Sequence, residues 1–215
     1  MFFSSPKIVV EVFRIVSNEF IHLAAVFHLL LVVLMAGWLF NSHRMNQLIS
    51  AYLAWLSLAV MIISINIGKT LGFQPLNVVT TTLFAGLIIL WLVELSKPRN
   101  IYTLRGKNKK TTMLVFFLGF LGFWYPVFTE NPFLGLLVSP LGLLPSPTLI
   151  VTLAILYLAH PKVNTLLHGY ATLLGWIHAI AGIKLGIRLD AALLLLSLYS
   201  TLLVSQRLYK PVEHP

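Results

Sequence analysis

Cysteine is absent from this chain of 215 residues, and charged side chains are scarce. Without cysteine, the protein cannot form disulfides or thiolate metal sites, and it has no cysteine nucleophile. Only 10% of its residues are charged, whereas a soluble domain usually carries about 25%. Such a deficit is expected when most side chains face lipid rather than water.

The sequence also lacks the motifs that most directly indicate chemistry. It contains no glycine-rich phosphate-binding loop and no spacing that pairs a nucleophile with a base. No lysine lies in the middle of the last apolar run, which disfavours a retinal Schiff base of the usual rhodopsin kind. The sequence therefore favours a protein that is not an enzyme, leaves that question open, and indicates no cofactor.

Apolar residues make up 58% of the chain, and the mean hydropathy is +0.90. A helix needs roughly 20 apolar residues to cross a hydrocarbon core of about 30 Å. The apolar runs lack the alternation of a membrane β-barrel. We therefore predict an all-α, polytopic transmembrane helical bundle that forms a single domain over residues 1–215. Seven spans are expected. Six of them lie at about residues 20–40, 48–67, 76–95, 113–128, 166–183 and 189–204, and the fifth along the chain ends at His160-Pro161.

Two segments stand apart from the predicted spans. Residues 1–18 form an amphipathic N-terminal segment, which fits either an interfacial helix or an early extension of the first span. This segment has no clean apolar signal-peptide core, so we expect the first span to be retained. Residues 97–111 form the only long hydrophilic stretch, with six basic residues from Lys97 to Lys110 and no acid.

The basic residues predict an orientation, because short cytoplasmic loops are enriched in lysine and arginine. A cytoplasmic 97–111 loop and seven spans place the N-terminus outside and the C-terminus inside. Of the 15 Lys and Arg residues, ten then lie inside and five outside. We expect a multi-pass protein of the plasma membrane, with anionic lipids bound at the basic loop. The sequence leaves open whether the protein forms a homo-oligomer or binds a membrane-protein partner. We do not expect it to bind nucleic acid.

The stretch SPLGLLPSPTLIV, residues 139–151, carries three prolines in an apolar neighbourhood. Ser146 suits an N-cap and Pro147 suits the first helical position. Only 13 residues, about 20 Å of helix, then precede His160-Pro161. Either this helix starts at membrane depth behind a re-entrant piece at 133–144, or that piece lies on the outer interface and the span is short.

The first alternative predicts a binding site. The free N–H groups of a half-helix, with the hydroxyls of Ser146 and Thr148, would bind an anion or a polar substrate. Intramembrane polar residues are the other default candidates for binding substrate, namely His178, His28 and Glu94. The two histidines could bind a metal or relay a proton if both faced the bundle interior. The structural alternatives are histidines hydrogen-bonded to a neighbouring helix, and Glu94 paired with a lysine of the basic loop.

Three further residues have mainly structural interpretations. Glu19 and His22 form an E-x-x-H, which places both on one helix face. Di-iron bundles use two such motifs and two further carboxylates, whereas this chain has one such motif and only six acids. Asp190 suits the first turn of the last span, where the helix dipole favours a carboxylate.

Four pieces of the chain carry a resemblance to a known family. They are VFRIVSNEF, GFQPLNVVTTTLF, LWLVELS and, most specifically, LLPSPTLIVTLAILYLAHP. The chain resembles a family of uncharacterised prokaryotic multi-pass membrane proteins, in which the last piece reads roughly Gly-Leu-Pro-Cys-Pro-Thr-Thr. The resemblance implies a helical membrane fold of about seven spans and no established function. Ser146 stands where those relatives often carry cysteine, which weakens any thiolate or soft-metal role at this position.

Three functions remain in competition at this stage. The first is a small-solute or ion transporter or channel with its site at Pro145–Thr148, which predicts a polar cavity that reaches Ser146. The second is a non-catalytic membrane subunit or scaffold, which predicts an apolar groove lined by small residues, for instance along 166–183. The third is an intramembrane metal or haem enzyme that uses His28 and His178.

Overall fold

The computed structural model describes residues 6–40, 42–71, 75–126, 133 and 135–209. Parts of two predicted elements, residues 1–5 of the N-terminal segment and 127–128 of the fourth span, lie outside these ranges. The described part is helical and contains no strand. Its helices are α1 (Pro6–Glu19), α2 (Ile21–Phe40), α3 (Ser42–Leu71), α4 (Pro75–Ser96), α5 (Lys109–Phe123), α6 (Gly135–Val138), α7 (Pro145–Ala159), α8 (Thr165–Lys184) and α9 (Asp190–Tyr209).

The predicted all-α bundle is confirmed, but the count of seven spans is not. Five helices in the described part are long and apolar enough to cross a membrane, with apolar stretches at residues 21–40, 45–68, 77–96, 165–184 and 190–209. At the predicted fourth and fifth spans, α5 and α7 have 15 residues each. Fifteen residues give about 22 Å of helix, which falls short of about 30 Å of hydrocarbon.

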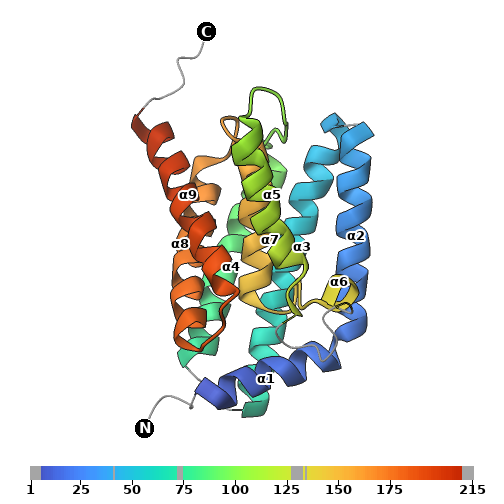
Figure 1. Cartoon of the computed structure of the whole chain (residues 1–215), viewed down its shortest axis with the longest axis vertical. Helices are drawn as coiled ribbons and strands as arrows, with labels where there is room; N and C mark the ends of the chain where they lie inside the picture. Colours follow the sequence, from blue (N-terminus) through green and yellow to red (C-terminus); the bar gives the residue numbers. More distant parts are fainter. Residues whose placement is uncertain (1–5, 41, 72–74, 127–132, 134, 210–215) are drawn as a thin grey trace.

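The long helices run up and down the long axis of the molecule, and α7 lies among them (Figure 1). It contacts α5, α8 and α9 closely and α3 more sparsely. Every residue of α7 from Pro147 to Ala159 is buried, which explains why this helix is apolar around its whole circumference. The short helix α7 is therefore the central element of the core.

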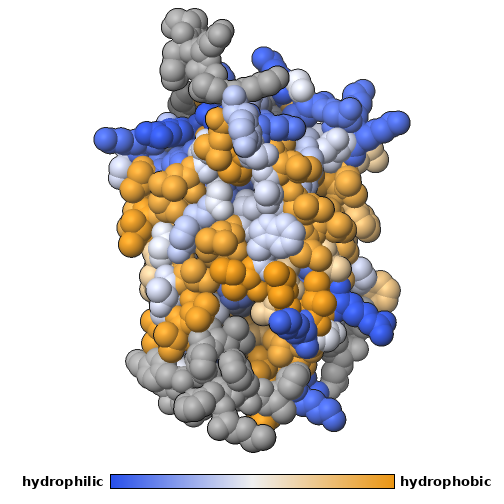
Figure 2. All heavy atoms as spheres, turned by 90° about the vertical axis from the view of Figure 1, so that its left-hand side faces the viewer, coloured by the Kyte–Doolittle hydropathy of each residue, from blue (hydrophilic) through white to orange (hydrophobic). Residues whose placement is uncertain are grey.

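Apolar side chains also cover much of the surface between the two ends of the bundle. On the face shown in Figure 2, hydrophobic residues predominate in the middle, with less hydrophobic ones among them, and hydrophilic residues gather mainly at the upper end. Large apolar residues such as Leu29, Val33 and Phe117 are more than half exposed. A surface of this kind fits a multi-pass membrane protein, because it would be unfavourable in water and favourable in lipid.

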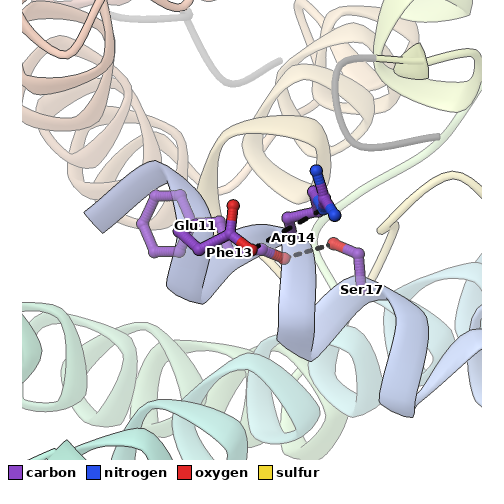
Figure 3. Close-up of polar contacts among 4 residues, drawn as sticks. All are labelled: Glu11, Phe13, Arg14 and Ser17. Carbon is purple, nitrogen blue, oxygen red and sulfur yellow. Dashed lines mark hydrogen bonds and ion pairs between the residues drawn. The ribbon is translucent and has the colours of Figure 1, made fainter. Parts of the chain in front are cut away.

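Helix α1 lies across the end of the bundle at which α2 begins (Figure 1). It is therefore a separate helix and not an extension of the first span. Val16 and Ser17 are buried, and the Ser17 hydroxyl donates to the Phe13 carbonyl over 2.7 Å (Figure 3). The opposite face carries Glu11 and Arg14, an exposed pair 3.8 Å apart that adds little stability.

The second half of the segment at 133–144 lies inside the bundle. Phe133 and Leu137 are exposed, whereas Leu141 and its neighbours up to Leu144 are buried. Gly142 has a positive φ of 74°, which favours glycine, and a Cβ there would lie 2.5 Å from Phe27 and 2.8 Å from Leu56. Leu56 is in the middle of the apolar stretch of α3. Helix α7 thus starts at a point where the preceding turn is buried against α2 and α3.

Candidate functional site

A small cavity lies at the N-terminal end of α7. Its volume is about 30 Å³, which is enough to hold a water molecule. Phe13 of α1 closes one side, and the prolines that flank Ser146 form part of another wall. Polar side chains from six separate parts of the chain line it, namely Ser64, Asn77, Thr80, Tyr125, Ser146, His178 and Asp190.

Asp190 carries the charge of this cavity. Its side chain is fully buried. The Tyr125 hydroxyl donates to Oδ1, and the Ser146 hydroxyl donates to Oδ2 over 3.0 Å. Among the described residues, no basic nitrogen lies within ion-pair distance of the carboxylate. A buried carboxylate is costly unless hydrogen bonds or a cation compensate it. Within the described part of the chain, these two hydroxyl groups alone donate to the carboxylate.

The helices and the turn around Asp190 leave space for its side chain. Gly182 of α8 packs directly on the carboxylate, and a Cβ at this position would overlap Oδ2. Tyr125 follows the end of α5, and its amide donates to the buried Ser139 hydroxyl over 3.1 Å. The glycine and the tyrosine therefore place α8 and the end of α5 against the start of α9.

The two predicted hydroxyl residues of α7 have different roles. The helix starts at Pro145 with Leu144 at the N-cap position, so the predicted N-cap at Ser146 is wrong. Pro145 serves as the first helical residue as well as Pro147 would, because neither proline has an N–H to satisfy. Ser146 lines the cavity, whereas Thr148 donates to the Leu144 carbonyl and accepts from the Gly142 amide, both over 2.8 Å.

His178 lines the cavity from α8, as the sequence suggested for a binding residue. Its side chain is 5% exposed, and Nε2 is buried without a hydrogen-bond partner in the described part of the chain. Its ring packs edge-on against Phe84 with 5.9 Å between centroids. Buried polar atoms nearly always have partners, so this nitrogen is available to a guest in the cavity.

His28 is not among the residues that line the cavity. Its Nδ1 lies 2.8 Å from the Ala24 carbonyl oxygen, and its Nε2 lies 2.9 Å from that of Phe123. The ring also contacts the Phe123 ring, with 4.5 Å between centroids. The structural alternative applies to His28, because both ring nitrogens face carbonyl oxygens and one of them links α2 to the end of α5.

Glu94 lies at the opposite end of α7 from the cavity. It is 1% exposed and accepts from the Arg99 amide over 2.8 Å and the Asn100 amide over 2.7 Å. Its second oxygen accepts from the Asn164 side chain over 3.0 Å. The expected pairing with a lysine of the basic loop is wrong, because backbone N–H groups and an amide take its place. Glu94 thus ties the loop after α4 to the start of α8.

Lys107 is the lysine that enters the protein from the basic loop. Its ammonium group donates to the carbonyl oxygens of Tyr157 over 2.7 Å and His160 over 2.8 Å at the end of α7. The Tyr157 carbonyl also accepts from the His160 amide over 3.2 Å. The ammonium group also lies 4.3 Å from the centroid of the Tyr157 ring. Burial lowers the pKa of Lys107 to about 8. Part of the loop at 97–111 is therefore a structural cap.

Metal coordination finds little support in the described residues. They contain no group of three histidine, aspartate or glutamate side chains arranged to hold an ion. The E-x-x-H pair does not lie on one helix, because Glu19 ends α1 and His22 belongs to α2. His28 and His178 contact different rings and different helices.

Sequence reasoning assigned Asp190 a structural role at a helix start and did not single out Tyr125. The scarcity of acids in the sequence could have indicated a functional role for Asp190, since a carboxylate at the end of an apolar run is a default functional candidate. No local pattern connects Tyr125 to Asp190, because 65 residues separate them.

Comparison of the chain with family models, with curated proteins and with solved structures gives no match. The resemblance to prokaryotic multi-pass membrane proteins therefore stays a prediction.

Proposed function

We propose that this protein is a small transporter or channel of the membrane, in which a small polar solute or ion binds in the cavity at the N-terminal end of α7. The observation that carries the proposal is the position of Asp190, which is fully buried, has no basic partner in the described part, and lines a polar cavity. Ionisable residues inside membrane proteins are rare and usually mark substrate or ion pathways.

The backbone around the cavity supports this proposal. Irregular backbone at membrane depth is tolerated where protein or water shields it, and it forms the midplane sites of many transporters. The turn at 139–144 supports such a site, since it is irregular and is buried against α2 and α3. In this proposal α5 and α7 cross only part of the bilayer and complete a bundle of seven membrane helices.

We also propose that the end of the bundle with the 97–111 loop faces the cytoplasm of a plasma membrane. Lys97, Arg99 and Arg105 are at this end, along with the lysine-rich start of α5. The N-terminus and α1 then lie outside. A reporter fused to the C-terminus should give a cytoplasmic signal, and an extracytoplasmic signal would overturn this orientation.

Transport is tested with the purified full-length protein in liposomes. We expect flux of at least one solute from a panel of small neutral solutes, anions and cations to exceed that of empty liposomes. Asp190→Asn should lower this flux to the background, and Gly169→Ala should not, because a Cβ at Gly169 meets only Val204 at an ordinary 3.7 Å. Equal flux through Asp190→Asn and the wild type would contradict the proposed site.

A second function, that of a membrane subunit, is favoured by one observation. An apolar groove of about 590 Å³ lies between α2, α5 and α7, lined by Met35, Phe120 and Ile155, with Gly119 and Ala154 at its floor. The sequence suggested such a groove along α8, and the structure has it elsewhere. A partner's transmembrane helix would fill it. Extraction in mild detergent tests this function, since a strictly monomeric preparation without partners counts against it.

A further inference from the structure

The charge of the cavity limits what it can bind. The N-terminus of a helix attracts anions, but at α7 the Asp190 carboxylate already lies there and accepts from Ser146. Two of the first three residues of α7 are prolines, which supply no N–H group to a ligand. An external anion would therefore meet a resident negative charge and few free donors.

The groups around Asp190 do not compensate the negative charge that its carboxylate gives to the cavity. Among the described residues that line the cavity are one acid, Asp190, one histidine, His178, and one phenol, Tyr125, but no lysine or arginine. At the same end of the bundle, Lys184 and Arg188 are exposed. On α1, which supplies Phe13 to the wall, the charged residues Lys7, Glu11 and Arg14 are also exposed. Solvent screens these exposed charges, whereas the charge of Asp190 is buried.

The chemistry of the walls suits a small, hard cation. Besides the carboxylate, hydroxyl groups of Ser64, Thr80 and Ser146 and the amide of Asn77 line the cavity. Oxygen ligands prefer hard ions over soft ones. Calcium takes six to eight oxygens and usually several carboxylates, and the described walls offer one carboxylate. The space of about 30 Å³ fits a guest the size of a water molecule.

We propose that the cavity binds a small monovalent cation, either an alkali ion or a proton, and that Asp190 carries the balancing negative charge. The cation compensates the buried carboxylate, which no described basic side chain does. The unpartnered Nε2 of His178 faces the same guest, directly or through a water molecule. This inference names the substrate class of the proposed transport site. Its physiological role rests on the proposed transport function.

Binding is tested without transport, on the purified full-length protein in detergent. Thermal unfolding is followed while lithium, sodium or potassium chloride replaces N-methyl-glucamine chloride at constant ionic strength, at several pH values. A ligand that binds only the folded state raises the unfolding midpoint. We expect the midpoint to rise with an alkali ion, with protons, or with both, and Asp190→Asn to lose this response. A response to alkali ions identifies a metal-ion site, and a response to pH alone identifies a proton site.

Two further variants keep the test decisive if Asp190→Asn does not fold. Ser146→Ala keeps the carboxylate and removes one of its donors, so cation binding should weaken about tenfold. Glu94→Gln alters the buried carboxylate at the other end of α7 and should retain the wild-type cation response. The proposal is overturned if no change of cation or pH moves the midpoint. It is also overturned if Ser146→Ala and Asp190→Asn respond as the wild type does.

The two proposals fail in different ways. Cation binding without any flux in liposomes would remove the transport function and keep the cation site. Flux of an anion or a neutral solute, with no cation response in the binding assay, would keep transport and remove the cation site.

Discussion

At the C-terminal end of α7, Lys107 donates to two carbonyl oxygens and Glu94 accepts from two backbone N–H groups. At the N-terminal end, the Asp190 carboxylate accepts, within the described part of the chain, from the side chains of Tyr125 and Ser146 alone. It lies beside a cavity and a histidine nitrogen that has no hydrogen-bond partner among the described residues. Both ends bury a carboxylate. The Glu94 carboxylate accepts hydrogen bonds from the backbone, whereas the Asp190 carboxylate lies beside a cavity that can hold a small ligand.

The difference shows how a buried acid can be assigned a structural or a functional role. Glu94 satisfies amides that would otherwise be unpaired, so its removal would damage the fold. The Asp190 carboxylate accepts from no backbone N–H group in the described part, and its hydroxyl donors can reorient when it is replaced. We therefore expect changes at the Glu94 end to affect stability, and changes at the Asp190 end to affect binding.

The largest effect should come from closing the gap that Asp190 fills. Gly182→Ala places a methyl group on the carboxylate and should lower the free energy of unfolding by about 3 kcal/mol or more through overpacking. Gly169→Ala, in the same helix, meets only an ordinary contact at 3.7 Å and should unfold as the wild type does or be slightly more stable. Thermal unfolding in detergent checks both variants. Equal losses would show that Asp190 does not pack against Gly182.

The two buried acids should respond in opposite ways to their amide analogues. Glu94→Gln turns an acceptor toward the Asn164 amide into a donor and should cost about 1.5–3 kcal/mol of stability. Asp190→Asn removes an uncompensated buried charge and should change stability by less than about 1 kcal/mol, or increase it. Denaturant unfolding of the two variants compares them directly. A larger loss for Asp190→Asn would reverse the assignment of roles.

Lys107→Met should have a moderate effect, because it removes the donors at the end of α7 and keeps most of the aliphatic volume. The expected loss is about 1–2 kcal/mol of unfolding free energy. Lys109→Met is the matched control, since Lys109 is exposed at the start of α5. Thermal unfolding measures both variants, and equal stability of the two would contradict the capping role of Lys107.

The smallest effect concerns pH. Lys107 loses its proton near pH 8 in the folded protein and near pH 10.5 when unfolded. Between these values the unfolded state binds more protons, so Lys107 makes the protein more stable as pH rises. The unfolding free energy of the wild type should increase relative to that of Lys107→Met over this range. Parallel pH profiles of the two proteins would contradict the shifted pKa.

Sequence reasoning predicted the helical segments better than it predicted their partners. The apolar runs predicted α2, α4 and α8 to within one residue at each end, because helix location follows from local composition. Helix α3 begins six residues before its predicted span, and α9 ends five residues after its own. The start of α7 was displaced by two residues, since Pro145 and Pro147 both suit a first helical turn. The burial of α7 was not anticipated, because an apolar helix looks the same whether lipid or protein surrounds it.

The candidate site was predicted only in part. Ser146 and His178 line one cavity, while Thr148 and His28 contact carbonyl oxygens elsewhere. The sequence marks such residues as polar in an apolar run but does not tell which of them meet. Asp190 lies 44 residues from Ser146, and contacts at that separation depend on how the helices pack.

The most direct test of a cation-accessible site at the start of α7 uses the absence of native cysteine. Single variants Ser146→Cys and Thr148→Cys are exposed to Ag⁺, a small monovalent cation that binds thiolates. The thiol left unreacted is then labelled with a fluorescent maleimide after denaturation. We predict that Ag⁺ protects the thiol of Ser146→Cys and leaves that of Thr148→Cys free, because Ser146 lines the cavity and Thr148 is fully buried behind it. Equal labelling of both variants after Ag⁺ treatment would contradict a cation site at this end of α7.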